Sequence, residues 1–517
     1  MATHMFGAIE GTMLTRLKVS GFKNLVDVDI SFGPFTCIAG PNGVGKSNLF
    51  DAIRFLSALA DHPLIDAALS VRDDTGRSAN VRSLFYKGGA QLANEMHFEA
   101  EMIIPAEGTD DLGQKAEAAA TFLRYSLTLA YREDPGRGLL GGLELIREEL
   151  THITSTMAPK HLLFPHKARL WRNSVVQGHR TAPFISTVGK GPERQIKLHQ
   201  DGTSGKPQGR LAVNLPRTVL SAANASESKT ALLARREMQS WRLMQLEPAA
   251  LRTPDEYSSP TSLSPDGSHL PATVYRLARR SSQDPSSGED IGVYARIANR
   301  LSDLIEDVRS ITVDRDERRQ LLTLCVEGRD GTFHEARALS DGTLRFLALA
   351  VLEQDPEAQG VLCLEEPENG IHPERIPAML RLLEDIATDV ELPIGPDNPL
   401  RQVIINTHSP SVVKQVPETS LLVAESRELI LGDQRVQAVS FCCLPNDWRT
   451  KRQGADSTRV CTKGKLLAYL NPELPPEPEE QGTGQGKANG GRLGNGAGRK
   501  RVIDRKDIQE LLPFESS

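Results

Sequence analysis

Long apolar runs are absent from this chain of 517 residues. No uncharged apolar stretch approaches the roughly 18 to 20 residues that a membrane-spanning helix needs. The opening, MATHMFGAIEGT, also lacks the charged head and long apolar stretch of a secretory signal. We therefore expect a cytoplasmic protein with no membrane partner.

Cysteine is scarce, with six residues in the whole sequence. Cys37 and Cys363 sit inside apolar runs, where cysteine acts as a small hydrophobic residue. Cys442, Cys443 and Cys461 have no partner at the spacing of a zinc site. The sequence therefore supports neither a disulfide framework nor a zinc knuckle.

An excess of positive charge is missing as well. The formal net charge is −6 and the pI is ≈ 6.1, so nothing in the overall charge favours nucleic acid, and any DNA contact needs a local basic groove. Apolar heptads are not sustained over three or more repeats, which excludes a long coiled-coil arm. With 39% hydrophobic residues, the chain can bury a sizeable core in two or three domains.

The pattern of apolar residues divides the chain into six segments. They are residues 14–95, with alternating strands, a glycine loop and a helix; 96–150, an antiparallel meander; 151–296, a mixed insertion whose fold the pattern does not predict; 297–470, helices and apolar strands of a parallel α/β core; 471–499, a flexible linker; and 500–517, a tail. The tail is either disordered or a docking peptide anchored by Leu511, Leu512 and Phe514.

GPNGVGKS fits the pattern G-x-x-x-x-G-K-[ST] between an apolar strand and a helix. Glycines let backbone N–H groups turn toward a β-phosphate, the lysine neutralises phosphate oxygens, and the serine hydroxyl ligates Mg²⁺. The alternative, a turn that merely needs glycines, is disfavoured by these flanks. The candidate nucleotide-binding residues are Gly40, Pro41, Asn42, Gly43, Val44, Gly45, Lys46, Ser47 and Asn48.

Two adjacent glutamates end a second apolar strand in LCLEEPENG. After a phosphate-binding loop, such a strand delivers a carboxylate beside Ser47, so Glu365 is the candidate Mg²⁺ ligand. Glu366 points elsewhere along the extended chain and is the candidate base that holds the attacking water. For a lone pair of glutamates, two solvated side chains at a strand end would be the better interpretation.

Two further motifs each allow two interpretations. In LSDGT, Ser340 and Asp341 are either a plain helix cap or, with the backbone N–H near Gly342, a second anion-binding helix start. In INTHSP, His408 follows an apolar strand and either bonds a γ-phosphate or serves the structure alone.

Taken in order, GPNGVGKS, LSDGT, LCLEEPENGIHP and INTHSP resemble the Walker A, signature, Walker B with D-loop, and switch-histidine motifs of ABC-type ATPases. The opening LKVSGFKNLVDVDISF resembles the N-terminal strands of the RecF/SMC branch. SDGTLRFLALAVL is similar to that branch's short "predicted AAA family ATPase" members, including Septu-type anti-phage ATPases. The resemblance implies an α/β P-loop NTPase fold, with a mainly parallel core sheet, an antiparallel β lobe, a helical or irregular insertion and no long coiled coil.

The same resemblance implies that two ATP molecules are sandwiched between two heads. One chain holds each ATP through Lys46, Ser47 and Glu365, and the other contributes Ser340, Asp341 and Gly342. The remaining implied roles are the catalytic base, Glu366; the γ-phosphate sensor, His408; a D-loop residue at the dimer interface, Asn369; and a basic residue near the nucleotide, Lys23. The glutamine loop of the family has no clear counterpart, and Gln91 is the nearest candidate.

These expectations favour a switch that binds ATP and Mg²⁺, hydrolyses ATP as a homodimer or higher even oligomer, and controls a separate effector such as a nuclease in anti-phage defence. The alternative is a RecF-like DNA repair ATPase that binds DNA. A scaffold that binds ATP without hydrolysis and a transporter motor are further alternatives, the last disfavoured by the N-terminal strands.

Overall fold

The computed structural model describes residues 11–71, 81–88, 91–133, 142–202, 207–280, 291–431, 434–451, 459–471 and 501–502. The expected linker and tail lie outside these residues, apart from residues 471, 501 and 502. None of the helices in the described ranges is both long and apolar enough to cross a membrane.

The central sheet has seven strands in the order β14, β19, β20, β3, β21, β22 and β23. Neighbours from β14 to β21 pair in parallel, and β22 runs antiparallel to β21. The strands span Arg242–Met244 (β14), Gly360–Glu365 (β19), Arg401–Thr407 (β20), Phe35–Ala39 (β3), Leu421–Leu431 (β21), Gln434–Cys443 (β22) and Arg459–Val460 (β23). Parallel pairing brings the residues that follow β3, β19 and β20 to one edge of the sheet.

Both faces of this sheet are buried. In β19, Val361 and Cys363 belong to the apolar core on one face, and Leu362 and Leu364 belong to the core on the other. Such burial explains the continuous apolar run before Glu365, because alternate side chains of a strand point to opposite faces.

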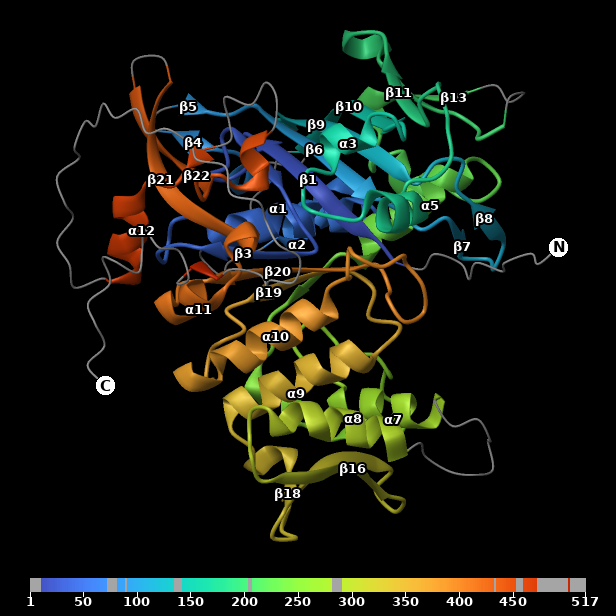
Figure 1. Cartoon of the computed structure of the whole chain (residues 1–517). Helices are drawn as coiled ribbons and strands as arrows, with labels where there is room; N and C mark the ends of the chain where they lie inside the picture. Colours follow the sequence, from blue (N-terminus) through green and yellow to red (C-terminus); the bar gives the residue numbers. More distant parts are fainter. Residues whose placement is uncertain are drawn as a thin grey trace.

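A second, antiparallel sheet of eight strands lies above the first, in the order β13, β12, β11, β10, β9, β6, β1 and β2 (Figure 1). Its strands span Gln208–Leu211 (β13), Gln195–Leu198 (β12), Ile185–Val188 (β11), Gly142–His152 (β10), Phe122–Arg132 (β9), Glu95–Ile103 (β6), Met13–Ser20 (β1) and Val28–Ser31 (β2). Helix α1, Lys46–Leu59, packs between the two sheets, where Phe55 meets Phe22 and Phe98 at ring distances of 5.7 Å.

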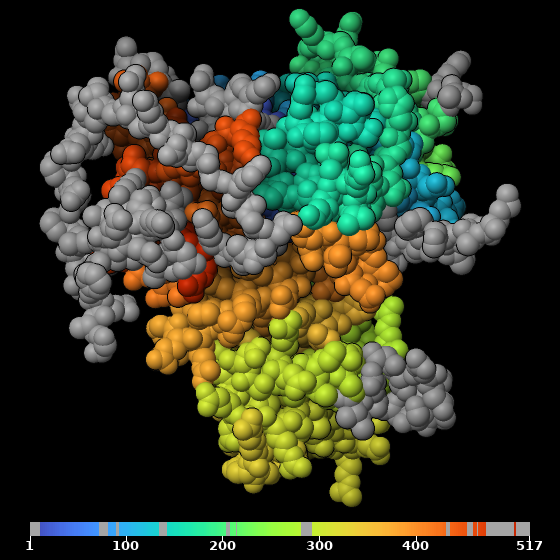
Figure 2. Space-filling view, viewed as in Figure 1, coloured from blue at the N-terminus to red at the C-terminus, as the bar shows by residue number. Residues whose placement is uncertain are grey.

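The other face of the central sheet is covered by helices α7 to α10 (Figure 1). These span Leu270–Arg280 (α7), Ile291–Ser302 (α8), Asp341–Gln354 (α9) and Ile376–Ile386 (α10). A small sheet caps them, with Asp255–Glu256 (β15), Val308–Asp316 (β16), Leu321–Gly328 (β17) and Phe333–Glu335 (β18). Figure 2 shows this part as a lobe that projects from the body of the molecule.

The mixed insertion contributes to both sheets. It supplies β11 to β13 and then helix α5, Lys229–Ser240, before β14 joins the edge of the central sheet. Elements outside the two large sheets are Leu64–Ser70 (α2), Ala158–His161 (α3), Asn173–Val175 (α4), Pro248–Leu251 (α6), Pro410–Gln415 (α11), Lys463–Leu470 (α12), Lys87–Gly88 (β4), Gln91–Leu92 (β5), Glu107–Thr109 (β7) and Lys115–Glu117 (β8). The expected α/β class, with a mainly parallel core sheet and an antiparallel lobe, is confirmed.

Candidate functional site

A pocket of ≈ 630 Å³ opens where β3 and β19 end. Its lining contains nine of the residues singled out from the sequence, Asn42, Gly43, Gly45, Lys46, Ser47, Asn48, Glu365, Glu366 and Asn369. It also contains Gln245, Leu246, Glu247, Arg345 and Asn406. The glycine loop and the paired glutamates, about 320 residues apart in sequence, thus face one space.

The loop between β3 and α1 has the backbone that a phosphate cradle needs. Gly45 has φ 113°, a conformation that favours glycine, and a Cβ there would lie 2.3 Å from Nδ2 of Asn24. Lys46 begins α1, and its ammonium donates hydrogen bonds to the backbone oxygens of Gly40 and Pro41 at 2.7 and 3.0 Å. Burial lowers the pKa of Lys46, against the opposite effect of the nearby Glu366 charge. The loop is therefore held closed around its own lysine.

Asn24, in the turn between β1 and β2, braces this loop. Its side-chain amide donates to the backbone oxygen of Val44 at 3.0 Å, and its Oδ1 accepts from Nδ2 of Asn48 at 2.8 Å. The neighbouring Lys23 pairs with Asp51 of α1 at 2.7 Å, and both side chains are buried. Lys23 is not among the residues that line the pocket.

The backbone turns between the paired glutamates, so the extended chain that the sequence predicts ends at Glu365. Glu365 is the last residue of β19, whereas Glu366 has φ 44°, which is uncommon for a residue with a side chain. Its backbone N–H donates to Oδ1 of Asn406 at 3.0 Å, which fixes the turn.

Two side chains hold the carboxylate of Glu366. Asn369 donates from Nδ2 to Oε2 at 2.9 Å, and Nδ1 of His408 lies 2.7 Å from Oε1. Burial acts to raise the pKa of Glu366, but these hydrogen bonds and the His408 and Lys46 charges outweigh it, and the pKa lies below its usual value. His408 is thus placed beside the candidate base, although it is outside the pocket lining.

Ser340 caps α9, and its hydroxyl accepts a hydrogen bond from the Thr343 N–H at 3.2 Å. Asp341 pairs with Arg252 at 2.6 Å. A Cβ on Gly342 would lie 2.1 Å from the backbone oxygen of Gly370, so the start of α9 packs tightly on the turn that carries Asn369. None of these three residues lines the pocket of its own chain.

Five residues of the pocket lining were not singled out from the sequence, and Gln245 and Arg345 are two of them. Gln245 directly follows the short strand β14, beside β19, whereas Gln91 belongs to the separate short strand β5. Arg345 of α9 donates from Nε to the backbone oxygen of Leu246 at 3.0 Å and from Nη1 to that of Asn369 at 2.6 Å. The only sequence signal for Gln245 is the apolar triplet around it, which is too short to distinguish a strand.

The pocket offers oxygen ligands of the kind that Mg²⁺ prefers. The hydroxyl of Ser47 and the carboxylate of Glu365 both face it. Elsewhere in the described ranges, no group of three or more His, Cys, Asp or Glu side chains could hold a metal ion. The residues therefore fit an ion held partly by a nucleotide, as in phosphoryl-transfer sites.

Two family models match separate parts of the chain. Residues 13–101 match "RecF/RecN/SMC N terminal domain", and residues 231–414 match "AAA domain, putative AbiEii toxin, Type IV TA system". The first match contains the glycine loop, and the second contains α9, the paired glutamates and His408.

Curated relatives are similar over short stretches. Structural maintenance of chromosomes protein 1 of Schizosaccharomyces pombe is 43% identical over 77 residues, which are 14% of this chain and 5% of that protein. DNA replication and repair protein RecF of Paenarthrobacter aurescens is 33% identical over 88 residues, 17% of this chain and 22% of that protein. OLD nuclease of Thermus scotoductus is 51% identical over 41 residues, 8% of each chain. The chain thus spans less than a quarter of the length of these relatives.

Solved structures of SMC heads also align with the chain. An Smc head bound to the C-terminal domain of ScpA, from Pyrococcus furiosus, covers 83% of this chain and 96% of its own at 11% identity and a TM-score of 0.41. The SMC head of Thermotoga maritima covers 82% and 97% at 13% identity and a TM-score of 0.34. The order of the motifs, the edge of the parallel sheet at which they meet and the two family matches together make the chain similar to ABC-type ATPases of the RecF/SMC-like branch.

Proposed function

We propose that the chain binds and hydrolyses ATP, and that two copies close on two ATP molecules. The observation that carries the proposal is the composition of the ≈ 630 Å³ pocket, where the glycine loop, Glu365 and Glu366 meet. The volume lies within the range of about 300 to 1,000 Å³ typical of small-molecule sites.

The motif residues in and beside the pocket have separate parts in the proposed reaction. Lys46 and the N–H groups at the start of α1 bind the phosphates, and Glu366 takes the proton of the attacking water. Asn369 and His408 orient the Glu366 carboxylate through the hydrogen bonds described above. Ser47 and Glu365 would hold Mg²⁺, which neutralises phosphate charge when bound.

The need for a second copy follows from Ser340 and Gly342. Both lie at the start of α9, outside the pocket of their own chain, yet a helix start of this kind binds anions. In a dimer, the Ser340 hydroxyl and the Gly342 N–H of one copy would contact the γ-phosphate held by the other. ATP hydrolysis would then require that two chains associate.

The proposed role of this switch is control of a separate effector, such as a nuclease, in anti-phage defence. Support comes from the match to the model named for the AbiEii toxin and from the similarity to an OLD nuclease. A RecF-like role on DNA is the second candidate, favoured by the 33% identity to a DNA replication and repair protein. Added duplex DNA that stimulates hydrolysis would favour the second role, and co-purification with a nuclease would favour the first.

The test of the proposed reaction uses the Glu366→Gln variant. Gln keeps the size and can still accept from Asn369, but it cannot take a proton. We expect it to bind ATP, to stop hydrolysing it and to double its molar mass in light scattering when ATP is added. Wild-type rates in this variant, or a monomer at saturating ATP, would contradict the proposal.

A further inference from the structure

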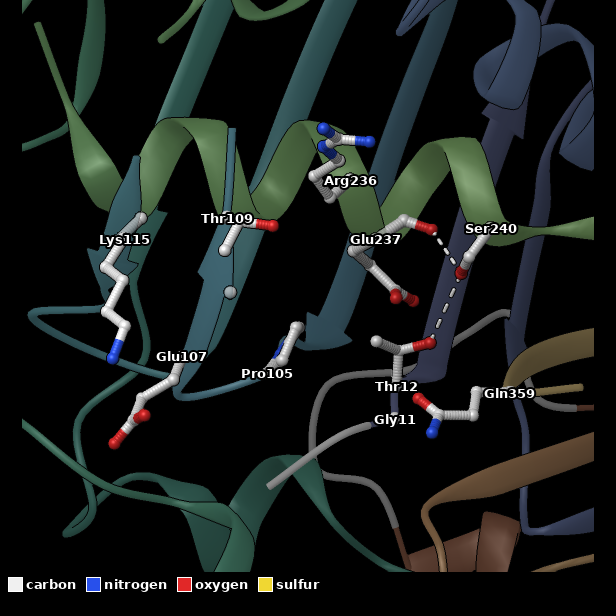
Figure 3. Close-up of a pocket in the computed structure, with 12 residues that line it drawn as sticks. Gly11, Thr12, Pro105, Glu107, Thr109, Lys115, Arg236, Glu237, Ser240 and Gln359 are labelled. Carbon is white, nitrogen blue, oxygen red and sulfur yellow. Dashed lines mark hydrogen bonds between the residues drawn. The ribbon is translucent and has the colours of Figure 1, made fainter. Parts of the chain in front are cut away.

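A second pocket, of ≈ 360 Å³, lies beside α5 and shares no residue with the nucleotide site (Figure 3). Its walls come from α5, from the β7–β8 hairpin and from the segments that enter β1 and β19. The lining includes Ser240, the last residue of α5 before β14, and Gln359, the residue just before β19. The pocket therefore lies at the amino ends of the two strands whose carboxyl ends carry Gln245 and Glu365.

The interior of this pocket holds one buried carboxyl group. Glu237 is 1% exposed, and its Oε1 accepts a hydrogen bond from the indole N–H of Trp241 at 2.6 Å. Its Oε2 has no partner that meets hydrogen-bond geometry among the described residues, although the hydroxyls of Thr12 and Ser240 lie close enough to lower the pKa of the carboxyl group. Figure 3 shows the carboxyl group pointing into the pocket. The nearby hydroxyls of Thr12 and Ser240 lie 3.4 Å from each other.

Glu237 presents a hydrogen-bond donor to the pocket. Burial raises the pKa of Glu237 to about 8, although hydrogen bonds from Thr12, Trp241 and Ser240 act to lower it, and this favours the neutral acid at pH 7. Because Oε1 already accepts from Trp241, the proton resides on Oε2. A neutral acid of this kind donates a hydrogen bond as a hydroxyl does.

The other charged side chains of the lining are Arg236, Lys115 and Glu107. Arg236 pairs with Asp111 at 2.6 Å at the rim. Lys115 and Glu107 are contributed by the two strands of the β7–β8 hairpin, with opposite charges. An incoming ammonium would need Glu237 in its ionised form, which burial disfavours, whereas an incoming acceptor oxygen can accept from the neutral acid.

We propose that this pocket binds a small organic molecule that has an apolar body and a carbonyl oxygen, which accepts a hydrogen bond from Oε2 of Glu237. A buried polar group without a partner destabilises the folded chain, and the ligand carbonyl supplies that partner. The inference is independent of ATP hydrolysis, because it rests on residues outside the nucleotide pocket.

Benzamide is a suitable probe, with benzylamine as the cation of matched size. We expect the full chain to bind benzamide with a Kd of about 1 mM or lower in a ligand-observed NMR titration, and benzylamine more weakly. Glu237→Leu removes the donor and should weaken benzamide at least about tenfold. Glu237→Gln keeps both the acceptor for Trp241 and a donor toward the pocket, so its affinity should stay within about threefold of wild type.

A comparison across pH keeps the proposal testable even if Glu237→Leu does not fold. Benzamide affinity of the wild type should fall between pH 7 and 9 as the donor ionises, while that of Glu237→Gln should not change. Arg236, Lys115 and Glu107 are the same in both proteins, so the difference reports Glu237 alone. Tighter binding of benzylamine, no binding of benzamide, or a wild-type affinity that does not depend on pH would overturn the proposal.

Discussion

Glu366 combines an uncommon backbone conformation with a fixed side chain. Its φ of 44° turns the chain away from β19. Asn406 fixes this backbone turn by a hydrogen bond, and Asn369 and His408 fix the carboxylate. A non-glycine residue in this region costs about 1 to 3 kcal/mol, so the surrounding contacts have to offset that strain. The lowered pKa keeps the carboxylate ionised and able to accept a proton from water.

The first prediction concerns this carboxylate. Glu366→Gln should lower the turnover number at least about 100-fold, because a general base is lost, while ATP affinity changes little. Initial-rate phosphate release and equilibrium binding of ATP measure the two quantities. Glu374→Gln, an exposed glutamate in the segment after the D-loop, serves as the control and should behave as wild type. An active Glu366→Gln variant would exclude the assigned role.

The second prediction compares Lys23 with Lys46. Lys23 pairs with the carboxylate of Asp51, whereas Lys46 bonds backbone oxygens of the glycine loop. Lys23→Ala leaves Asp51 buried without its cation and should lower the free energy of unfolding by about 3 kcal/mol, with ATP affinity of the folded protein retained. Lys46→Ala should instead abolish ATP binding, with a smaller loss of stability that comes from its two hydrogen bonds to the backbone of its own loop. Urea unfolding and ATP titration separate the two effects. Lost ATP affinity in Lys23→Ala without lost stability would restore a nucleotide role for Lys23.

Among single residues, the sequence predicts the site residues that lie in contiguous motifs. The loop from Gly40 to Ser47 and the pair at Glu365 carry their own spacing, and the structure brings them to one pocket. Lys23 fits a position in the family, but its partner Asp51 lies one turn into α1 and cannot be inferred from the motif. Gln245 has no motif at all, since only the pairing of β14 with β19 places it.

The contact between α9 and the turn after β19 links two halves of the site. Arg345 bonds the backbone oxygens of Leu246 and Asn369, and Gly342 packs on Gly370. A shift of α9 therefore displaces the segments that carry Gln245 and Asn369 as well. The signature helix and the paired glutamates are mechanically joined.

The third prediction tests this link. Arg345→Met keeps most of the apolar stem but removes both hydrogen bonds, so turnover should fall about tenfold while ATP affinity stays within about threefold. Steady-state kinetics separate the turnover number from KM. Arg319→Met, at an exposed site in the β16–β17 hairpin, is the control. Equal kinetics for the two variants would contradict the proposed coupling.

Among elements, local patterns predicted the strands and helices but not all of their partners. The strands near residues 14–32 and the meander at 96–150 appear as separate features in the sequence, yet β1 pairs with β6 along its whole length. That register depends on contacts some 80 residues apart, which no local pattern encodes. The insertion was not predictable for the same reason, because its strands complete two different sheets.

Buried glutamates make the stability of the whole molecule depend on pH. Burial raises the pKa of Glu148 to about 7 and that of Glu237 to about 8, so both hold a proton in the folded chain that the unfolded chain releases above about pH 4.5. A raised carboxyl pKa therefore favours the folded state at low pH, and that contribution is lost as the pH rises from about 4.5 to the folded pKa of each group.

The fourth prediction follows for Glu237. Between pH 5 and pH 7, the free energy of unfolding of the wild type should fall relative to Glu237→Gln by about 1.4 kcal/mol per pH unit, because the amide cannot ionise. Urea unfolding at the two pH values gives the difference directly. A difference that does not change with pH would show that Glu237 is ionised in the folded chain.

At the scale of the assembly, each chain is proposed to supply half of each ATP site. Lys46 and Glu366 face the pocket, whereas Ser340 lies outside it. A chain that lacks Lys46, or one that lacks Ser340, therefore cannot form a complete site from its own residues. A mixed dimer of two defective chains would still contain one complete site, with Lys46 from one copy and Ser340 from the other.

The most direct test is to mix two inactive variants, Lys46→Ala and Ser340→Arg, and to measure ATP hydrolysis. Each variant alone should be inactive, and the mixture should regain about a quarter of wild-type turnover, because half of randomly paired dimers are mixed and each holds one complete site. Full activity of Ser340→Arg alone, or a mixture that stays inactive although the two chains form mixed dimers, would contradict the account.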